Sequence, residues 1–577
     1  MIGRTRPAWL DRHVTLGLCA YTHDSAAGLI VDGELVGFVE EERLSGIKHT
    51  RDYPRQAVDW LLDSQQMQPG DVTDVCYNFQ PQRYLDSLRQ LPEQLRSQPT
   101  RARAAARAGS FVRVAARTRS RLHRLGARFP RARVHAIRHH RAHGLYAFAS
   151  SGYDEAAVLV VDSLGEVETT TIGHARRDPA SLRIIDSVAD PASLGYVYGA
   201  VTEHLGWRRG DEEGTVMALA ALGDPDRFAE VFAQAIPVTD DGFAVDSAWF
   251  PLRVLSSRSL RIGLRFVAAT CPPRAAGEPI DQAHRDLAAA LQQRTEQVMV
   301  ALAVRARALT GSRLLCLGGG VAANCVAAAK IVETGLFDEV HIPPAPGDSG
   351  TAIGAAVETE LARTGTLPTG IGQRCYLGPD YPALELPLTP RPGLRAESVK
   401  DPARLVAEQL AAGRVVGIFH GRVEAGPRAL GNRSILASPL HPEVVDRLNA
   451  TVKYREPFRP FAPVVLAGEA EKYFTLTQPA PFMSFASGVT DLARAAVGAI
   501  VHANDTARLQ TVDARANPLL SAILTEFASL TGVPVLINTS LNVKGSPICG
   551  TPEMALDCLL GSGLDALMMQ GWWVTKC

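Results

Sequence analysis

A β-hairpin pattern occurs twice in the N-terminal half of the chain, and this repeat limits the folds that the half can adopt. An apolar run over 14–19 precedes two β-rich runs, 26–31 and 34–39, which are joined by Asp32-Gly33. Asp-Gly is typical of a two-residue hairpin turn, because both positions need positive φ. About 130 residues later, 153–166 repeats the pattern before a Val/Thr-rich strand. Unrelated hairpins can also look alike, so duplication of one α/β unit is our hypothesis.

Two further predicted strands each lead into a glycine-rich loop and then a helix. The strand over 313–317 precedes Gly318-Gly-Gly-Val-Ala-Ala-Asn324, and the strand over 339–343 precedes a loop that ends in Gly347-Asp-Ser-Gly350. Glycine lets the backbone approach phosphate groups, and the free N–H groups of a helix N-terminus favour anions. One such loop can be a simple packing turn, but two loops together favour a nucleotide site.

The chain has 577 residues, too many for one compact core. Its composition changes to glycine and proline over 365–395, without clear periodicity. We place a domain boundary there. The region beyond it has its own predicted strands, 415–419 and 533–538. The predicted domains are therefore 1–375 and 396–577.

Charge and cysteine content exclude several classes of function. Sixty basic and sixty acidic residues give a formal net charge of zero, so no global field attracts nucleic acid or acidic membranes. We find neither an apolar run of about 18 residues nor the apolar segment of a signal peptide. Nine scattered cysteines without a CxxC pair are typical of reduced thiols. We expect a cytoplasmic protein with no membrane partner.

One segment departs from this balance, because 101–133 contains eleven arginines and no acidic residue. A nucleic-acid-binding arm is one interpretation. The other is a solvated helical insertion beside a cleft for an anionic ligand. We favour the insertion, since Phe111 and Phe129 are the only aromatic residues available for base stacking.

A pair of histidines suggests a metal site. His139 and His143 are four residues apart in His-His-Arg-Ala-His, a spacing that places both imidazoles on one helix face. Paired histidines often lie on a surface, so a metal site also needs carboxylates. Asp162, after a predicted strand, and Asp348, in the second glycine-rich loop, are the candidates. Such a set suits Fe²⁺, Zn²⁺ or Mn²⁺, and we expect His140 to point elsewhere.

Arginine, lysine, asparagine and serine concentrate in four polar segments of the C-terminal region. Guanidinium forks bind phosphate oxygens in pairs, and short polar side chains hold the remaining oxygens. Any one arginine can belong to a surface ion pair, but four segments within about 120 residues favour a substrate with several anionic groups. The segments are 421–434, 453–461, 502–512 and 538–545.

Together these motifs resemble the O-carbamoyltransferase family, which includes nodulation-factor, cephamycin, aminoglycoside and ansamycin carbamoyltransferases. The likeness runs from Thr15 to about Trp573 and is most specific in GPRALGNRS, VKYREPFRPFAP and NTSLNVKGSPI. HDSAA, EEERLSGIKH, HHRAH, GGGVAAN and PGDSG are also present in the family's order. The resemblance implies an α/β protein: a threonylcarbamoyl-transferase-like domain on a duplicated actin/hexokinase ATPase fold, followed by a YrdC-like α/β domain.

The resemblance also implies an activity. Carbamoyl phosphate and ATP would form carbamoyl-adenylate in the C-terminal domain, and the carbamoyl group would pass to a hydroxyl of a secondary metabolite, as in antibiotic biosynthesis. The implied cofactors are a divalent metal in the N-terminal domain, Fe²⁺ by resemblance, and Mg²⁺ with ATP. The implied partners are ATP, carbamoyl phosphate and a small-molecule hydroxyl acceptor rather than nucleic acid, and a homodimer is compatible with this reading.

Carried over residue by residue, the resemblance gives four groups of site residues. The catalytic residues are His23, as general base or orienting group, and Lys48, in contact with the adenylate. An imidazole with a pKa near 6.5 suits removal of a hydroxyl proton at neutral pH. The metal ligands are His139, His143, Asp162 and Asp348. ATP and carbamoyl phosphate are bound by Arg428, Lys453, Arg459, Arg508, Asn538 and Ser540, and carbamoyl-adenylate by Gly319, Gly320, Val321, Asn324 and Gly350.

Two positions depart from the family's pattern. Asp162-Ser163 stands where Asp-Gly is frequent, and Glu212-Glu-Gly-Thr215 lacks the lysine that often follows the glycine. These departures make the contacts at the transfer site harder to infer than those at the adenylation site. Two other functions remain open: a tRNA threonylcarbamoyl transferase-like enzyme, which the basic segment favours mildly, and a sugar-kinase-like ATPase, which would release ADP.

Overall fold

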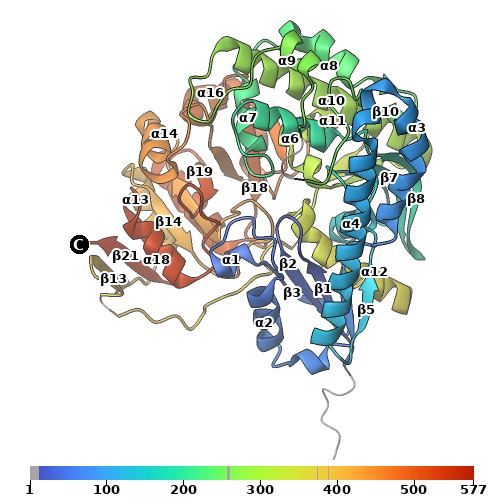
Figure 1. Cartoon of the computed structure of the whole chain (residues 1–577). Coiled ribbons are helices and arrows are strands. Elements are labelled where there is room, and N and C mark those ends of the chain that lie inside the picture. The colour runs from blue at the N-terminus through green and yellow to red at the C-terminus, as the bar shows by residue number, and fades with distance from the viewer. Residues whose placement is uncertain (1–11, 257–259, 373, 388) are drawn as a thin grey trace, which may run out of the picture.

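The computed structural model describes residues 12–256, 260–372, 374–387 and 389–577 (Figure 1). Two five-stranded sheets lie in the N-terminal half and a nine-stranded sheet lies in the C-terminal region, with helices packed between and around them. The predicted α/β class is therefore confirmed. None of the helices in these described ranges is long and apolar enough to cross a membrane.

The first sheet begins with the predicted hairpin. Strand β1 pairs antiparallel with β2, which pairs antiparallel with β3, while β4 and β5 continue the sheet in parallel on the other side of β1. Asp32 and Gly33 join β2 to β3 with φ values of 50° and 82°, as the two-residue turn requires. The order β3-β2-β1-β4-β5 uses β1 (Val14–Cys19), β2 (Ala26–Val31), β3 (Glu34–Glu40), β4 (Asp74–Tyr77) and β5 (Arg133–Ala136).

The second sheet repeats this arrangement. Strand β6 pairs antiparallel with β7, β7 pairs antiparallel with β8, and β11 and β12 extend the sheet in parallel from β6. Two sheets with the same order and directions confirm the predicted duplication. The order β12-β11-β6-β7-β8 uses β6 (Glu155–Val161), β7 (Glu168–Arg177), β8 (Ala180–Ala189), β11 (Leu314–Gly318) and β12 (Glu339–His341).

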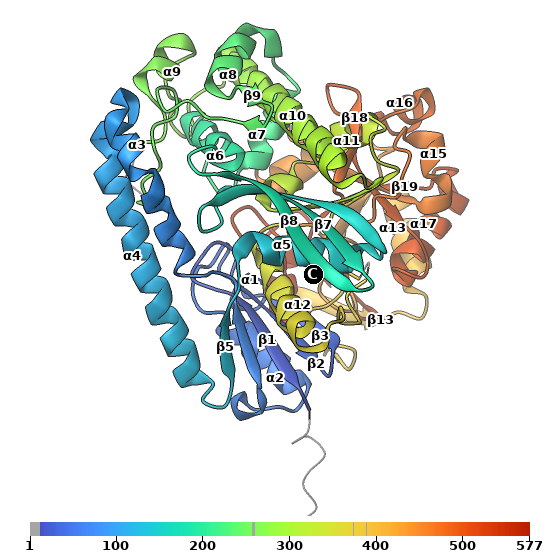
Figure 2. The same cartoon turned by 90° about the vertical axis from the view of Figure 1, so that its right-hand side faces the viewer.

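Two helices join these sheets back to back (Figure 2). Helix α5 (His139–Ser151) packs on β6 and β11, helix α12 (Thr351–Thr364) packs on β1 and β2, and the helices pack on each other. Glycine permits the close approach, because a Cβ at Gly354 would lie 1.8 Å from the carbonyl oxygen of Ala142. The contact brings the first turn of α5 near the loop that precedes α12, so it positions the predicted metal ligands.

The C-terminal sheet is mixed and has the order β13-β21-β20-β14-β15-β19-β16-β18-β17. Between it and α12, the described residues of 366–393 form only isolated bridge pairings. The domain limits 1–375 and 396–577 and the YrdC-like assignment stay predictions. The strands are β13 (Leu394–Ser398), β14 (Val416–Phe419), β15 (Arg433–Ala437), β16 (Ala462–Leu466), β17 (Phe485–Gly488), β18 (Thr506–Val512), β19 (Val535–Ser540), β20 (Ala566–Met569) and β21 (Trp572–Lys576).

The arginine-rich segment forms one long helix, α4 (Gln98–Arg128), along one side of the N-terminal half (Figure 2). Its inner face is packed: Phe111 is fully buried, and buried Arg107 pairs with Asp190. Arg113 and Arg117 on the outer face are exposed. The predicted helix is present, but it is a packed element with one solvated face rather than a fully solvated insertion.

We predict that Gly354→Ala destabilises the protein. Alanine favours a helix over glycine by up to about 1 kcal/mol, but the new methyl group would overlap the Ala142 carbonyl. Overpacking of this kind costs about 1–3 kcal/mol, so the midpoint of thermal unfolding should fall. Gly468→Ala is the control, since no atom lies within 4 Å of its added Cβ. Equal midpoints for the two variants would contradict the proposed helix contact.

Candidate functional site

The four predicted metal ligands converge at the end of the second sheet. His139 and His143 lie in the first turns of α5, Asp162 directly follows β6, and Asp348 begins the turn before α12. One ligand atom from each lies within 4.8 Å of the others. The two histidines are buried, Asp162 is 6% exposed, and the Asp348 side chain is 18% exposed. We call these four residues the donor cluster.

The geometry of the donor cluster fits a divalent cation. The Nε2 atom of His139 lies 3.1 Å from Nε2 of His143, 3.4 Å from Oδ1 of Asp348 and 3.6 Å from Oδ2 of Asp162. Two imidazole nitrogens that face each other this closely cannot both carry protons, whereas a shared cation satisfies both. Two imidazoles with two carboxylates form a donor set for a borderline metal ion.

Neighbouring groups orient the donors. Nδ1 of His139 lies 3.3 Å from the carbonyl oxygen of Asn78, which leaves Nε2 for the cluster. The backbone N–H of Gly320 donates to Oδ1 of Asp162 at 3.0 Å, and Oγ1 of Thr22 donates to Oδ2 of Asp348 at 3.2 Å. His140 lies near Thr171 instead and is absent from the cluster, as expected.

The electrostatics of the two cluster histidines differ. Burial opposes the charged form of His139, but Asp348 and Asp162 outweigh burial and raise its pKa. Burial, reinforced by His139, lowers the pKa of His143. One imidazole is therefore poised to carry positive charge and the other to stay neutral. A bound cation would take over the positive charge that the two carboxylates stabilise.

His23, the predicted base, lies beside the donor cluster and is held by a carboxylate. Its Nδ1 atom is 2.7 Å from Oδ2 of Asp24, while Oδ1 of Asp24 is 2.6 Å from Nδ1 of His49. With Nδ1 donating to Asp24, the Nε2 atom of His23 is free to accept a proton. That atom faces Gly210, where an added Cβ would lie 3.0 Å away.

A row of polar groups leads from His23 to a large cavity. Nε2 of His49 is 2.9 Å from Oδ1 of Asp211, which also accepts from Lys48. Burial opposes protonation of His49, but its bonds to Asp211 and Asp24 raise the pKa to about 9. An imidazolium between two carboxylates therefore fixes Asp24, and Asp24 in turn orients His23. Lys48, His49 and Asp211 line the cavity.

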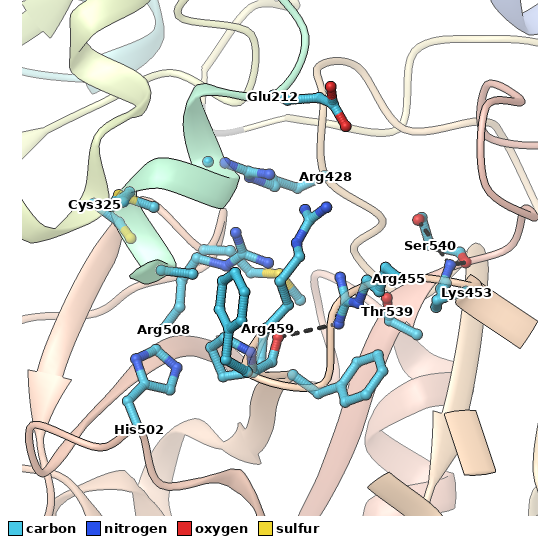
Figure 3. Close-up of a pocket in the computed structure, with 18 of the residues that line it drawn as sticks. Glu212, Cys325, Arg428, Lys453, Arg455, Arg459, His502, Arg508, Thr539 and Ser540 are labelled. Carbon is cyan, nitrogen blue, oxygen red and sulfur yellow. Dashed lines mark hydrogen bonds between the residues drawn. The ribbon is translucent and has the colours of Figure 1, made fainter. Parts of the chain in front are cut away.

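The cavity has a volume of about 900 Å³ and opens between the two halves of the chain. Its walls come from the Lys48 loop, α7 (Glu213–Ala220), the start of α11 (Cys325–Glu333) and the four polar segments of the C-terminal region. Figure 3 shows Arg428, Arg459 and Arg508 gathered in it, with Lys453 beside Ser540. We call it the cationic cavity.

The cationic cavity contains both paired and unpaired cations: Lys48 and Arg43 are paired with the carboxylates of Asp211 and Glu42, which also line it. Among the described residues, no carboxylate oxygen lies within 4 Å of the charged nitrogens of Arg428, Arg455, Arg459, Arg508 or Lys453. Arg508 and burial lower the pKa of Arg428 to about 9, and burial with Arg459 lowers that of Arg455 to about 9. Each of these cations disfavours the charged form of its neighbours, so the group is suited to bind a ligand with several negative charges.

Lys453 is held on neutral oxygens. It ends a π-helical turn over Leu448–Lys453, and Tyr454 follows with a φ of 46°. Its Nζ atom donates to Oδ1 of Asn542 at 2.8 Å and lies 3.2 Å from Oγ of Ser540. Burial, with Arg455, lowers its pKa to about 7. A bound anion would therefore stabilise the charged form of Lys453 and raise its pKa.

The structure brings together most of the predicted site residues. All seven of Lys48, Arg428, Lys453, Arg459, Arg508, Asn538 and Ser540 line the cationic cavity. The glycine-loop residues do not: Gly319, Gly320, Val321, Asn324 and Gly350 are absent from its walls, although Cys325 and Val326 line it. Asn324 instead caps α11 by accepting from the N–H of Ala327 at 3.0 Å. Adenylate binding by these five residues stays a prediction.

Four site residues were not predicted: Asp24, His49, Asp211 and Arg455. Three of them neighbour a predicted residue in the sequence, since Asp24 follows His23, His49 follows Lys48, and Arg455 lies two residues after Lys453. Asp211 directly precedes the Glu212-Glu-Gly-Thr215 departure. Nothing in the sequence indicated that Asp24 and Asp211 would both bond to His49.

Comparison with known proteins supplies the family. The Carbamoyltransferase N-terminus model matches residues 14–357, and the Carbamoyltransferase C-terminus model matches 407–576. Nodulation protein NolNO of Sinorhizobium fredii is 32% identical over 96% of this chain and 79% of its own length. Nodulation protein NolO of Bradyrhizobium diazoefficiens is 38% identical over 76% of this chain and 79% of its own length. HypF of T. kodakarensis aligns over 61% of this chain and 48% of its own at 13% identity, with a TM-score of 0.31, too low to identify a shared fold.

We predict that His143→Ala weakens metal binding at the donor cluster. Removal of one of two facing imidazoles leaves an incomplete donor set, so the purified variant should retain far less iron, zinc or manganese than the wild type. Elemental analysis after incubation with each metal measures this loss. His123→Ala, on the exposed face of α4, is the control. Equal metal content in the His143 variant and the wild type would contradict the site.

We predict that anion binding in the cationic cavity takes up a proton near neutral pH. The free pKa of Lys453 is about 7, and a bound phosphate raises it, so affinity falls as pH rises above 7. Calorimetry of inorganic pyrophosphate binding in buffers of different ionisation enthalpy measures this uptake. Lys453→Arg should show less uptake, because guanidinium stays charged, whereas Lys472→Arg at an exposed position should match the wild type. Identical uptake in both variants would rule out Lys453 as the group.

Proposed function

The chain belongs to the carbamoyltransferase family, and from this premise we propose that it is an ATP-dependent O-carbamoyltransferase with carbamoyl phosphate as donor. One observation carries the proposal. A cavity whose wall includes four arginines and a lysine that form no ion pair within the described part of the chain lies at one end of a polar row, and the donor cluster lies at the other. The first suits phosphate-rich substrates, and the second suits a separate transfer step.

The first step would activate the carbamoyl group in the cationic cavity. Water cleaves carbamoyl phosphate to carbamate and phosphate. A carbamate oxygen then attacks the α-phosphorus of ATP, the bond to the β-phosphate oxygen breaks, and pyrophosphate leaves. Arg428, Arg459 and Arg508 would hold the phosphate oxygens and stabilise the charge on the leaving pyrophosphate. Asn538 and Ser540 would fix the remaining polar groups, and Mg²⁺ would accompany ATP.

The second step would occur beside the donor cluster. The acceptor hydroxyl oxygen attacks the carbamoyl carbon, the bond to the adenylate oxygen breaks, and AMP leaves. His23 would take the hydroxyl proton at Nε2, with Asp24 fixing the tautomer through Nδ1. Lys48 would contact the adenylate from the cavity side. A divalent metal on His139, His143, Asp162 and Asp348, Fe²⁺ by resemblance, would supply a Lewis acid for the carbonyl or the phosphate.

We propose that each step belongs to one domain. Residues 1–375 would form the transfer domain on the duplicated sheets, and residues 396–577 would form a YrdC-like adenylation domain. The acceptor would be a hydroxyl-bearing secondary metabolite, as in antibiotic biosynthesis, and the reaction would take place in the cytoplasm. The cationic cavity and the donor cluster are separate, which supports a division into two steps. An adenylate that passes from one site to the other inside the protein would be protected from hydrolysis.

We predict that Arg428→Ala prevents adenylation. Without an acceptor, the wild-type protein should release pyrophosphate from Mg²⁺-ATP and carbamoyl phosphate and form carbamoyl-adenylate. Loss of one charged donor to a developing anion lowers the rate about 100-fold or more. A pyrophosphate assay and mass spectrometry measure the two products.

Arg395→Ala provides the control, because Arg395 is exposed on β13 and lies outside the cavity. It should adenylate at the wild-type rate. Release of ADP without pyrophosphate would contradict the proposal and favour a sugar-kinase-like ATPase. Transfer of labelled carbamoyl to tRNA rather than to small hydroxyl compounds would favour the threonylcarbamoyl alternative.

A further inference from the structure

The Glu40-Glu41-Glu42-Arg43 run lies at the end of β3 and the start of α1 (Glu42–Ser45), and the proposed mechanism does not use it. All four residues are buried, with at most 9% of each residue exposed. Four adjacent buried charges carry a large desolvation cost unless each has defined partners. Each of the four does have partners, and they lie in different segments of the chain.

Arg43 and Glu40 bind one residue of the C-terminal region. The backbone N–H of Gly426 donates to Oε1 of Glu40 at 2.7 Å, and Nη2 of Arg43 donates to the carbonyl oxygen of Gly426 at 2.6 Å. Gly426 is two residues before Arg428, which points into the cationic cavity (Figure 3). The N-terminal half therefore holds both backbone polar groups of Gly426, on the two peptide units that flank it, beside the proposed phosphate fork.

Glu42 extends these contacts to a second segment of the cavity wall. Its Oε1 atom accepts from Nη1 of Arg43, and its Oε2 atom accepts the backbone N–H of His49 at 2.8 Å. His49 follows Lys48, and both line the cavity. Arg43 thus stands between the two loops that carry Arg428 and Lys48.

Two glycines near Arg43 pack tightly against neighbouring backbone. A Cβ at Gly426, whose φ is +93°, would lie 1.9 Å from the carbonyl oxygen of Pro344. A Cβ at Gly550 would lie 1.8 Å from the carbonyl oxygen of Arg43. Because both neighbours are packed to contact, displacement of Arg43 has to move the loops themselves.

We propose that Glu40, Glu42 and Arg43 form a clamp that positions Arg428 and Lys48 in the wall of the cationic cavity, so that phosphate binding in the C-terminal region depends on side chains of the N-terminal half. Glu42 and Arg43 also reach the cavity wall, but they bond to Gly426, to His49 and to each other, so we class the three as positioning residues rather than catalytic ones. The proposal rests on the proposed function only for its kinetic readout, because anion binding by the cavity can be measured without catalysis.

Glu41 offers a matched control within the same run. It is as buried as its neighbours, but its carboxylate accepts from the backbone N–H groups of Gln56 and Ala57, at the start of α2 (Arg55–Ser64). Glu41 therefore anchors a helix away from the cavity. Glu41→Gln and Glu42→Gln remove the same charge from adjacent positions.

The test measures the affinity of inorganic pyrophosphate by calorimetry and the KM for ATP in pyrophosphate release. Arg43→Lys keeps the charge but not the two-armed geometry, and we expect both constants to weaken by about ten-fold to one hundred-fold, the scale of an ångström-sized misplacement. Glu42→Gln should shift them in the same direction, while Glu41→Gln should leave both within about two-fold of the wild type, even where its unfolding midpoint falls.

A double-mutant cycle separates positioning from loss of folding. If Arg43 acts through Arg428, Arg43→Lys should add little to the affinity loss already caused by Arg428→Lys. Full additivity, wild-type affinity in folded Arg43→Lys, or equal losses in the Glu41 and Glu42 variants would overturn the clamp. A wild-type protein that binds pyrophosphate but releases none from ATP would refute the proposed function, and the affinity series would still decide the clamp.

Discussion

Repulsion among partly buried arginines and one buried lysine is the constraint on which the rest of the C-terminal region depends. Arg428, Arg455, Arg459, Arg508 and Lys453 share one cavity, and none has a carboxylate within ion-pair distance in the part of the chain that the structure describes. Neutral partners hold two of them: Asn449 accepts from Arg455, whose guanidinium also lies 4.3 Å from the Phe461 ring centre, and Asn542 accepts from Lys453. A neutral partner fixes the direction of a charged side chain but does not neutralise its charge. The charge can therefore still form an ion pair with an anionic ligand.

Residues of the N-terminal half help to position the cationic cavity, and their charged groups have carboxylate partners instead of neutral ones. There the positive groups are paired with carboxylates: Arg43 with Glu42, Lys48 with Asp211, and His49 with Asp24 and Asp211. These pairs are internally compensated, which makes them suitable as anchors. Paired charges in the N-terminal half therefore hold loops in place, whereas unpaired charges in the C-terminal region are available to bind a ligand.

The sequence predicted individual turns, strands and helices better than it predicted which distant segments contact one another. Asp32-Gly33 fixes a local turn, and the spacing of His139 and His143 fixes a helix face, so both were readable from neighbouring residues. Asp162 and Asp348 were predictable because parallel strands end at a common edge. The glycine loop has a packing role that its sequence did not reveal: a Cβ at Gly319 would overlap the Val161 carbonyl, and Asn324 caps a helix, while adenylate binding there stays a prediction. The clamp and the His49 contacts join segments far apart in the chain, and no local pattern encodes such a pairing.

The topology of the C-terminal sheet has a consequence for biosynthesis. Strand β14 lies inside the sheet, yet its parallel neighbour β20 is formed by Ala566–Met569, about 150 residues later. A ribosome releases the chain from the N-terminus, so both duplicated sheets can fold while β14 still waits for its partner. The cationic residues therefore come together last, against a surface that already presents Arg43. The N-terminal half, which is synthesised first, therefore provides the surface on which the C-terminal region folds. The paired charges of the N-terminal half are in place before the unpaired cations of the cavity come together.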